Sequence, residues 1–83
     1  MFRLKLTTRA KRELKNISRR HQITLATIFE EIKDDPLIGK PLGKELSGKY
    51  SYKVSVFRII YKVNENDKII TIITAGHRAT VYR

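Results

Sequence analysis

Cysteine is absent from this sequence, and acidic residues are scarce. Without cysteine the chain can form neither disulfide bonds nor thiolate metal sites, and it has no cysteine nucleophile. The same absence fits a reducing compartment, so we expect a cytoplasmic location. No stretch of about 18 apolar residues occurs, so no transmembrane helix is expected. Residues 1–6 also lack the apolar run of a signal peptide.

Positive charge is the strongest global feature. The chain has 18 Lys and Arg residues against 8 Asp and Glu, which gives a net charge of +10 in 83 residues, and its pI is about 10.2. A pI above about 9 is typical of a nucleic-acid-binding domain. An acidic protein partner is an alternative. A membrane surface is less favoured, because it would require a basic helix with large apolar anchors on its other side.

Hydrophobic periodicity divides the chain into strands and helices. Three segments alternate with a period of two, a fourth is rich in Ile and Thr, and two more repeat at helical spacing. The expected elements, in chain order, are a strand at 2–6, a helix carrying Ala10, Leu14 and Ile17, a turn at 18–21, a second helix carrying Leu25, Ile28, Phe29 and Ile32, a loop at 36–48, and strands at 49–55, 57–63 and 68–75. Thr7 or Thr8 can cap the first helix.

This order, β-α-α-β-β-β, predicts a single α+β domain over residues 1–83. In it, an N-terminal helical hairpin packs on one face of a mostly antiparallel four-stranded sheet. The helices must bury their apolar stripes, and a sheet face is the only large apolar surface available to them. The strand at 68–75 is apolar on both sides, so we expect it in a central position.

The opposite face of the predicted sheet is polar and cationic. By alternation it holds Ser51, Lys53, Arg58 and Lys62. Arg78 follows the last strand, and Tyr82 comes four residues later. Cations that converge with a tyrosine can hold a scissile phosphate and stack a base. The simpler interpretation is a solvated basic face, as most charge runs are.

Metal and cofactor chemistry finds little support. A metal site requires a cluster of His, Cys or carboxylate ligands, and His21 and His77 are far apart in the sequence. We therefore expect no metal, and without a glycine-rich phosphate loop we expect no cofactor. His77 adjoins Arg78 and has either a structural role or a role in the same site, where a histidine can shuttle protons.

A site built from lysine and arginine suits the cleavage of RNA. RNA carries its own nucleophile, the 2′-OH, so an enzyme need only deprotonate it, stabilise the added charge on phosphorus and protonate the leaving 5′-oxygen. Cations stabilise that charge directly, and a lysine surrounded by positive charge gives up its proton more readily. DNA lacks the 2′-OH and would not be cut by this route.

Four segments together resemble the RelE/ParE toxin superfamily. They are Leu46–Val54, Phe57–Val63, Gly76–Arg78 and Val81–Arg83. The resemblance covers the whole chain, including the N-terminal strand and helical hairpin. Within the superfamily the chain is most similar to the RelE branch, whose members are endoribonucleases that cleave mRNA in the ribosomal A site.

The resemblance implies roles for four residues. Arg58 matches the arginine that contacts the scissile phosphate, and Arg78 matches a second catalytic arginine. Lys53 matches a lysine that binds or activates around the 2′-OH, and Tyr82 matches a tyrosine that stacks on or orients the base. Some RelE proteins have a second lysine two residues before the first, and this chain has Ser51 there.

The resemblance also implies partners, namely mRNA on the ribosome, 16S rRNA, and a cognate acidic antitoxin. Further residues expected to bind RNA are Lys40, Lys44, Lys49, Ser51, Lys62, His77 and Arg83. Two alternatives remain within the superfamily: a ParE-like inhibitor that binds DNA gyrase, and an inactivated relative that binds only an antitoxin or RNA. The joint presence of Lys53, Arg58, Arg78 and Tyr82 favours the nuclease.

Overall fold

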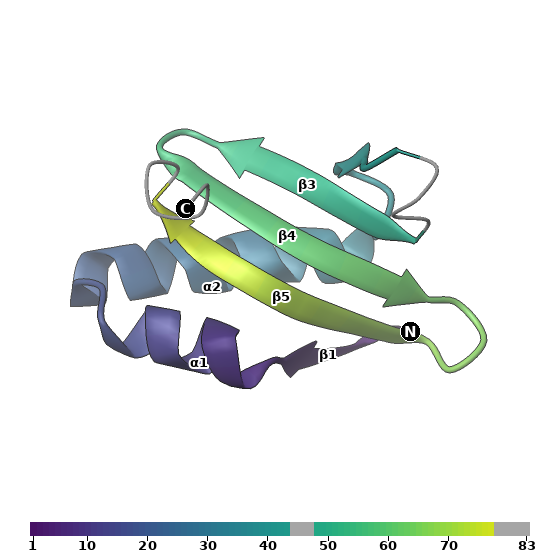
Figure 1. The fold of residues 1–83 in the computed structure, drawn as a ribbon, viewed down its shortest axis with the longest axis horizontal. Helices are drawn as coiled ribbons and strands as arrows, with labels where there is room; N and C mark the ends of the chain where they lie inside the picture. The colour runs from purple at the N-terminus through teal and green to yellow at the C-terminus, as the bar shows by residue number, and fades with distance from the viewer. Residues whose placement is uncertain (44–47, 78–83) are drawn as a thin grey trace.

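The computed structural model describes residues 1–43 and 48–77 and contains two helices and five strands within them (Figure 1). In chain order these are β1 (Arg3–Leu6), α1 (Thr8–Lys15), α2 (Arg19–Asp34), β2 (Lys40–Pro41), β3 (Lys49–Val54), β4 (Phe57–Asn64) and β5 (Ile69–His77). Neither helix in this part of the chain is long and apolar enough to span a bilayer.

The strands form one sheet in the order β1-β5-β4-β3-β2. β1 runs parallel to β5, and the other three pairings are antiparallel. The α+β class and the central place of the Ile- and Thr-rich strand are confirmed, because β5 lies between β1 and β4. The expected count of four strands is wrong, since β2 forms inside the predicted loop. Two residues are too few to show a period, and Pro41 lacks an N–H and suits only an edge strand.

Each helix begins at a hydroxyl cap. The Thr7 Oγ1 accepts a hydrogen bond from the Ala10 backbone N–H at 3.0 Å, and the Ser18 Oγ accepts from the His21 N–H at 3.3 Å. The turn predicted at 18–21 is therefore too long, because residues 19–21 form the first turn of α2 once Ser18 caps it.

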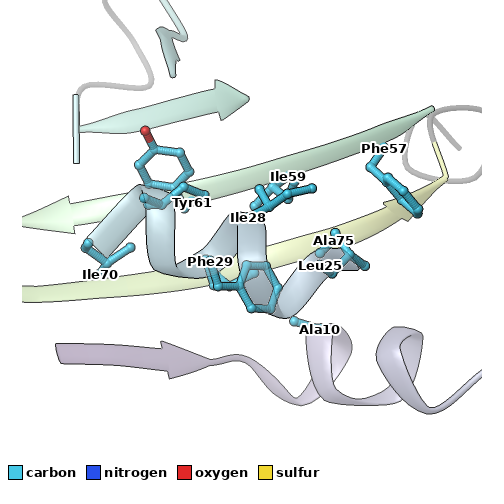
Figure 2. Packing of buried hydrophobic residues seen from close by; sticks show 11 residues of the cluster. Ala10, Leu25, Ile28, Phe29, Phe57, Ile59, Tyr61, Ile70 and Ala75 are labelled. Carbon is cyan, nitrogen blue, oxygen red and sulfur yellow. The ribbon is translucent and has the colours of Figure 1, made fainter. Parts of the chain in front are cut away.

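The core lies between α2 and one face of the sheet (Figure 2). α2 contributes the buried stripe predicted from its sequence, and the sheet contributes every second residue of β4 together with two isoleucines and an alanine of β5. The buried hydrophobic residues are Ala10, Leu25, Ile28, Phe29, Ile32, Phe57, Ile59, Tyr61, Ile70, Ile72 and Ala75. In Figure 1, α2 runs behind the sheet, and the face toward the viewer carries no helix.

The hydroxyl of Tyr61 ties the loop after α2 to the sheet. It donates to the Pro36 carbonyl at 2.7 Å and accepts from the Gly39 N–H at 3.0 Å. A Cβ on Gly39 would lie 2.8 Å from this hydroxyl, so a side chain there would collide with it. Burial raises the pKa of Tyr61 above its usual value. The tie places the next residue, Lys40, beside Ser51 in the β2–β3 pairing.

We predict that Tyr61→Phe lowers the free energy of unfolding by about 1–3 kcal/mol, because it leaves a buried N–H and a carbonyl without their partner. Urea denaturation measures this change. Tyr50→Phe is the matched control: Tyr50 stacks on Tyr61 at 5.5 Å, and its hydroxyl makes no hydrogen bond to the residues that the structure describes. Its effect should stay within about 0.5 kcal/mol. Equal losses in the two variants would contradict the role given to the Tyr61 hydroxyl.

Candidate functional site

The face of the sheet that the helices leave uncovered, here called the open face, gathers cations from β3 and β4. Lys53 lies directly opposite Arg58, and Lys49 lies directly opposite Lys62. Residues directly opposite each other in an antiparallel pair point to the same face. Because Arg58 alternates with the buried Phe57 and Ile59, both pairs belong to the open face.

The edge strands extend the same surface. Lys40 on β2 pairs with Ser51, which shares its face with Lys49 and Lys53. On β1, Arg3 and Lys5 are exposed and alternate with two half-buried leucines that face the core. The described strands contain no Asp or Glu. The cations of the open face are Arg3, Lys5, Lys40, Lys49, Lys53, Arg58 and Lys62.

The cross-strand pairs Lys53–Arg58 and Lys49–Lys62 set like charges against each other. Directly opposed like charges destabilise a sheet, whereas opposite charges would stabilise it by roughly 0.2–1 kcal/mol. A fold that keeps two such pairs on one face gives up stability there, as proteins do at functional sites. A polyanion laid across the face would remove the repulsion by pairing with both cations of each pair.

Arg58 differs from the other cations because it is nearly buried, with 7% of its surface exposed. It stands between exposed Lys53 on β3 and Gly76 on β5, which contributes no side chain. Its guanidinium presents a planar fork of donors suited to phosphate. A cation whose motion is restricted by burial is a preorganised donor, which is the most effective way to stabilise charge that develops in a transition state.

Ser51 occupies the middle of this surface, between the two like-charge pairs. It is 9% exposed, and its Oγ has no hydrogen-bond partner among the residues that the structure describes. Buried hydroxyls are normally paired. Ser51 therefore places a buried hydroxyl between the two like-charge pairs. A direct contact between Ser51 and RNA stays a prediction.

His77 lies apart from these cations. The register sets it opposite Phe57, so the exposed imidazole belongs to the face that the helices cover, and Gly76 takes the place beside Arg58. On that covered face, His21 packs edge-on against Phe57 with ring centroids 4.9 Å apart. A binding role for His77 stays a prediction. Four other predicted residues, Lys44, Arg78, Tyr82 and Arg83, lie outside the described residues.

The described residues form a hollow that is separate from the Lys53–Arg58 pair. A hollow of about 500 Å³ lies at the other end of β4, and it shares only Lys62 with the open-face cations. Its lining residues are Gly48, Tyr50, Lys62, Val63, Asn64, Glu65 and Asn66. Neither Lys53 nor Arg58 lines it. A long anion that follows the strands fits the charge distribution better than a small molecule in this hollow.

Reasoning from the sequence missed two features of the site. Arg3 and Lys5 were recognisable as the basic side of the first strand, but only the β1–β5 pairing shows that they share the open face. Glu13 of α1 contacts Thr74 of β5, which lies two residue pairs along the sheet from the Arg58–Gly76 pair. Those residues are 61 positions apart, and no local pattern connects them.

Known proteins are similar to this chain in both sequence and fold. Residues 4–82 match the family described as the ParE toxin of the type II toxin–antitoxin system parDE. Toxin RelG of Mycobacterium tuberculosis is 30% identical over 84 residues, which cover 99% of this chain and 97% of RelG.

Two solved structures illustrate the likeness. The toxin–antitoxin complex RelBE2 of M. tuberculosis contains a chain with a TM-score of 0.84 and 28% identity, covering 93% of this chain and 98% of that one. The isolated RelE toxin of Escherichia coli has a TM-score of 0.81 at 24% identity, covering 99% and 92% of the two chains, and it shares the fold. With a family match over nearly its whole length and a toxin relative covered almost end to end, this chain belongs to the RelE/ParE superfamily of type II toxin–antitoxin toxins.

Proposed function

We propose that the chain is a metal-independent endoribonuclease that cleaves mRNA in the ribosomal A site and thereby inhibits translation. The observation that carries the proposal is the directly opposed pair of Lys53 and Arg58. Its arginine is nearly buried, and the strands around it hold cations and no carboxylate. Such a site can stabilise a charged phosphorus centre, and the described strands offer no carboxylate for acid–base catalysis.

The reaction follows from the chemistry of RNA. The 2′-oxygen attacks the adjacent phosphorus as its proton is removed, the bond from phosphorus to the 5′-oxygen breaks, and that oxygen takes up a proton. The products are a 2′,3′-cyclic phosphate and a free 5′-hydroxyl. Arg58 donates to the non-bridging oxygens as their charge grows. Lys53, across the strand pair, acts around the 2′-OH. Arg78 is proposed as a second cation on the phosphate and Tyr82 as the base-stacking residue.

The remaining cations of the open face bind the RNA backbone on either side of the cleaved bond. Lys40, Lys49 and Lys62 lie along β2, β3 and β4 on the same face, where phosphate contacts give affinity without base recognition. A cytoplasmic toxin of this kind requires a cognate antitoxin. We propose an acidic one, because negative charge on the partner would complement the net charge of +10 and favour fast, specific association.

A second candidate is a ParE-like inhibitor that binds DNA gyrase and cuts no RNA. The observation that favours it is the match of residues 4–82 to the ParE toxin family. Primer extension on mRNA from cells that express the chain separates the two candidates. Cleavage at defined positions within codons supports the nuclease, whereas intact mRNA together with damaged DNA supports the gyrase inhibitor and overturns our proposal.

Replacement of either cation of the central pair should slow cleavage strongly while the chain stays folded. We expect Lys53→Ala and Arg58→Lys to lower kcat about 100- to 1000-fold, as the loss of one preorganised charge donor does. Arg58→Lys keeps the buried charge and removes only the planar fork. Arg20→Ala, at an exposed position of α2, is the control. Cleavage rates on programmed ribosomes, with thermal unfolding as the check on folding, test this. Full activity in both variants would refute the assignment.

The peripheral cations should govern affinity and its salt dependence. For single strands, the logarithm of the association constant falls with the logarithm of salt concentration by about 0.7 per phosphate contact. Lys62→Ala should therefore reduce this slope by about 0.7 and leave kcat unchanged, as measured by fluorescence anisotropy with a 2′-O-methyl oligonucleotide. Lys11→Ala on α1, an exposed lysine off the sheet, should not alter the slope. Equal slopes for the Lys62 variant and the unsubstituted chain would contradict the role of the open face.

A further inference from the structure

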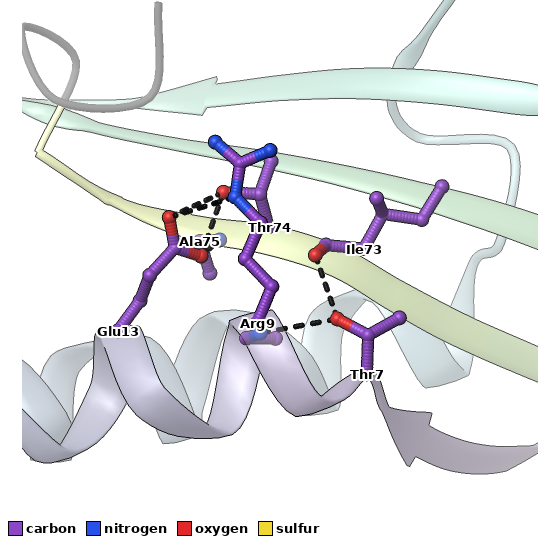
Figure 3. A network of polar contacts seen from close by, with 7 residues as sticks. Thr7, Arg9, Glu13, Ile73, Thr74 and Ala75 are labelled. Atoms are coloured by element: carbon purple, nitrogen blue, oxygen red, sulfur yellow. Dashed lines mark hydrogen bonds and ion pairs between the residues drawn. The ribbon is translucent and has the colours of Figure 1, made fainter. Parts of the chain in front are cut away.

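The edge of β5 that faces away from β4 is paired with β1 along its first half and contacts the start of α1 along its second half. β1 pairs with β5 only as far as Leu6 opposite Ile72, and β5 continues to His77. Beyond that point the start of α1 takes over. The Thr7 N–H donates to the Ile72 carbonyl at 3.1 Å, and the Thr7 hydroxyl donates to the Ile73 carbonyl at 2.8 Å. Figure 3 shows α1 lying along this edge.

Glu13, one and a half turns into α1, holds the next part of the edge. Its Oε1 and Oε2 accept from the Thr74 hydroxyl at 2.7 and 2.8 Å, and Oε1 accepts from the Ala75 N–H at 3.2 Å. The Arg9 Nε lies 3.4 Å from Oε2. The carboxylate thus replaces a neighbouring strand at this point, because it accepts a hydrogen bond from the Ala75 backbone N–H, which β1 is too short to reach (Figure 3).

These contacts lie next to the proposed catalytic pair. Thr74 is opposite Ile60, and Gly76 is opposite Arg58. The Glu13 carboxylate therefore fixes Thr74 and Ala75, the two residues of β5 immediately before Gly76, which lies opposite Arg58. Thr74 is 2% exposed, and the side chain of Glu13 is 20% exposed. Water competes little for either hydrogen bond.

We propose that Glu13 is a positioning residue for RNA cleavage. It acts through Thr74 and Ala75 to hold the end of β5 against Arg58, and it makes no contact with the substrate. This inference rests on the proposed nuclease function. A small displacement of a positioned catalytic group can lower the rate about 100-fold, whereas the lysines that bind the backbone lie on β2, β3 and β4 and do not depend on Glu13. Loss of Glu13 should therefore affect kcat and leave KM nearly unchanged.

The test is a double-mutant cycle of Glu13→Ala and Thr74→Val on cleavage kinetics, measured well below the unfolding temperature of each variant. We expect each single variant to lower kcat about 100-fold. The double variant should be no worse than Glu13→Ala, because both substitutions break the same contact. Glu13→Gln keeps an acceptor for the Ala75 N–H and should recover part of the rate. Glu30→Ala removes an exposed acid of α2 and serves as the charge control.

A second readout does not need activity. Native-state hydrogen exchange should show faster exchange of the Ala75 amide in Glu13→Ala, with α2 amides unchanged. Unchanged Ala75 exchange, a kcat equal to that of the unsubstituted chain, or a rise in KM at constant kcat would each overturn the proposal. If the unsubstituted chain cuts no RNA at all, the nuclease function fails, and the exchange result still reports whether Glu13 holds β5.

Discussion

In the part of the chain that the structure describes, both helices pack on the same face of the sheet, and the rest of the arrangement depends on this. Two helices pack behind the strands, so every strand must present apolar residues to one side and polar residues to the other. The alternation that buries Ile59 and Tyr61 necessarily turns Arg58 and Lys62 to the opposite side. The cationic open face and the hydrophobic core are therefore two consequences of one pattern. A shift of a strand's register by one residue would turn its core side chains to the open face and its cations into the core.

The open face contains like-charge repulsion, and contacts elsewhere in the fold compensate for the stability that it costs. Lysine opposite arginine and lysine opposite lysine repel within the sheet, and this repulsion weakens the β3–β4 pairing. Other contacts supply compensating order. The Tyr61 hydroxyl ties the α2–β2 loop to β4, and the Glu13 carboxylate ties α1 to β5. One of these polar contacts thus anchors β4, which carries Arg58, and the other anchors β5, which flanks it.

Much of this arrangement could be predicted from the sequence, because alternation and helical spacing are local signals. They identified the order of every helix and strand except β2, the core stripe of α2, the central strand and the shared face of Lys53 and Arg58. Non-local features were not predictable. β2 is too short to show a period. The pairing register between β4 and β5 shifts between Ile60 and Tyr61 of β4, and this irregularity obscures the alternation of side chains along β5. The burial of Arg58 and the partner of Glu13 depend on tertiary packing.

The central claim is that the open face binds RNA and the helical face does not. Backbone amide chemical-shift mapping by NMR during titration with a 2′-O-methyl oligoribonucleotide tests it directly, since this ligand keeps the phosphates and cannot be cleaved. The account predicts that the largest shifts fall on β3 and β4, at Lys53, Arg58 and Lys62, and weaken at higher salt. Shifts concentrated on α2, with the amides of Lys53 and Arg58 unmoved, would contradict it.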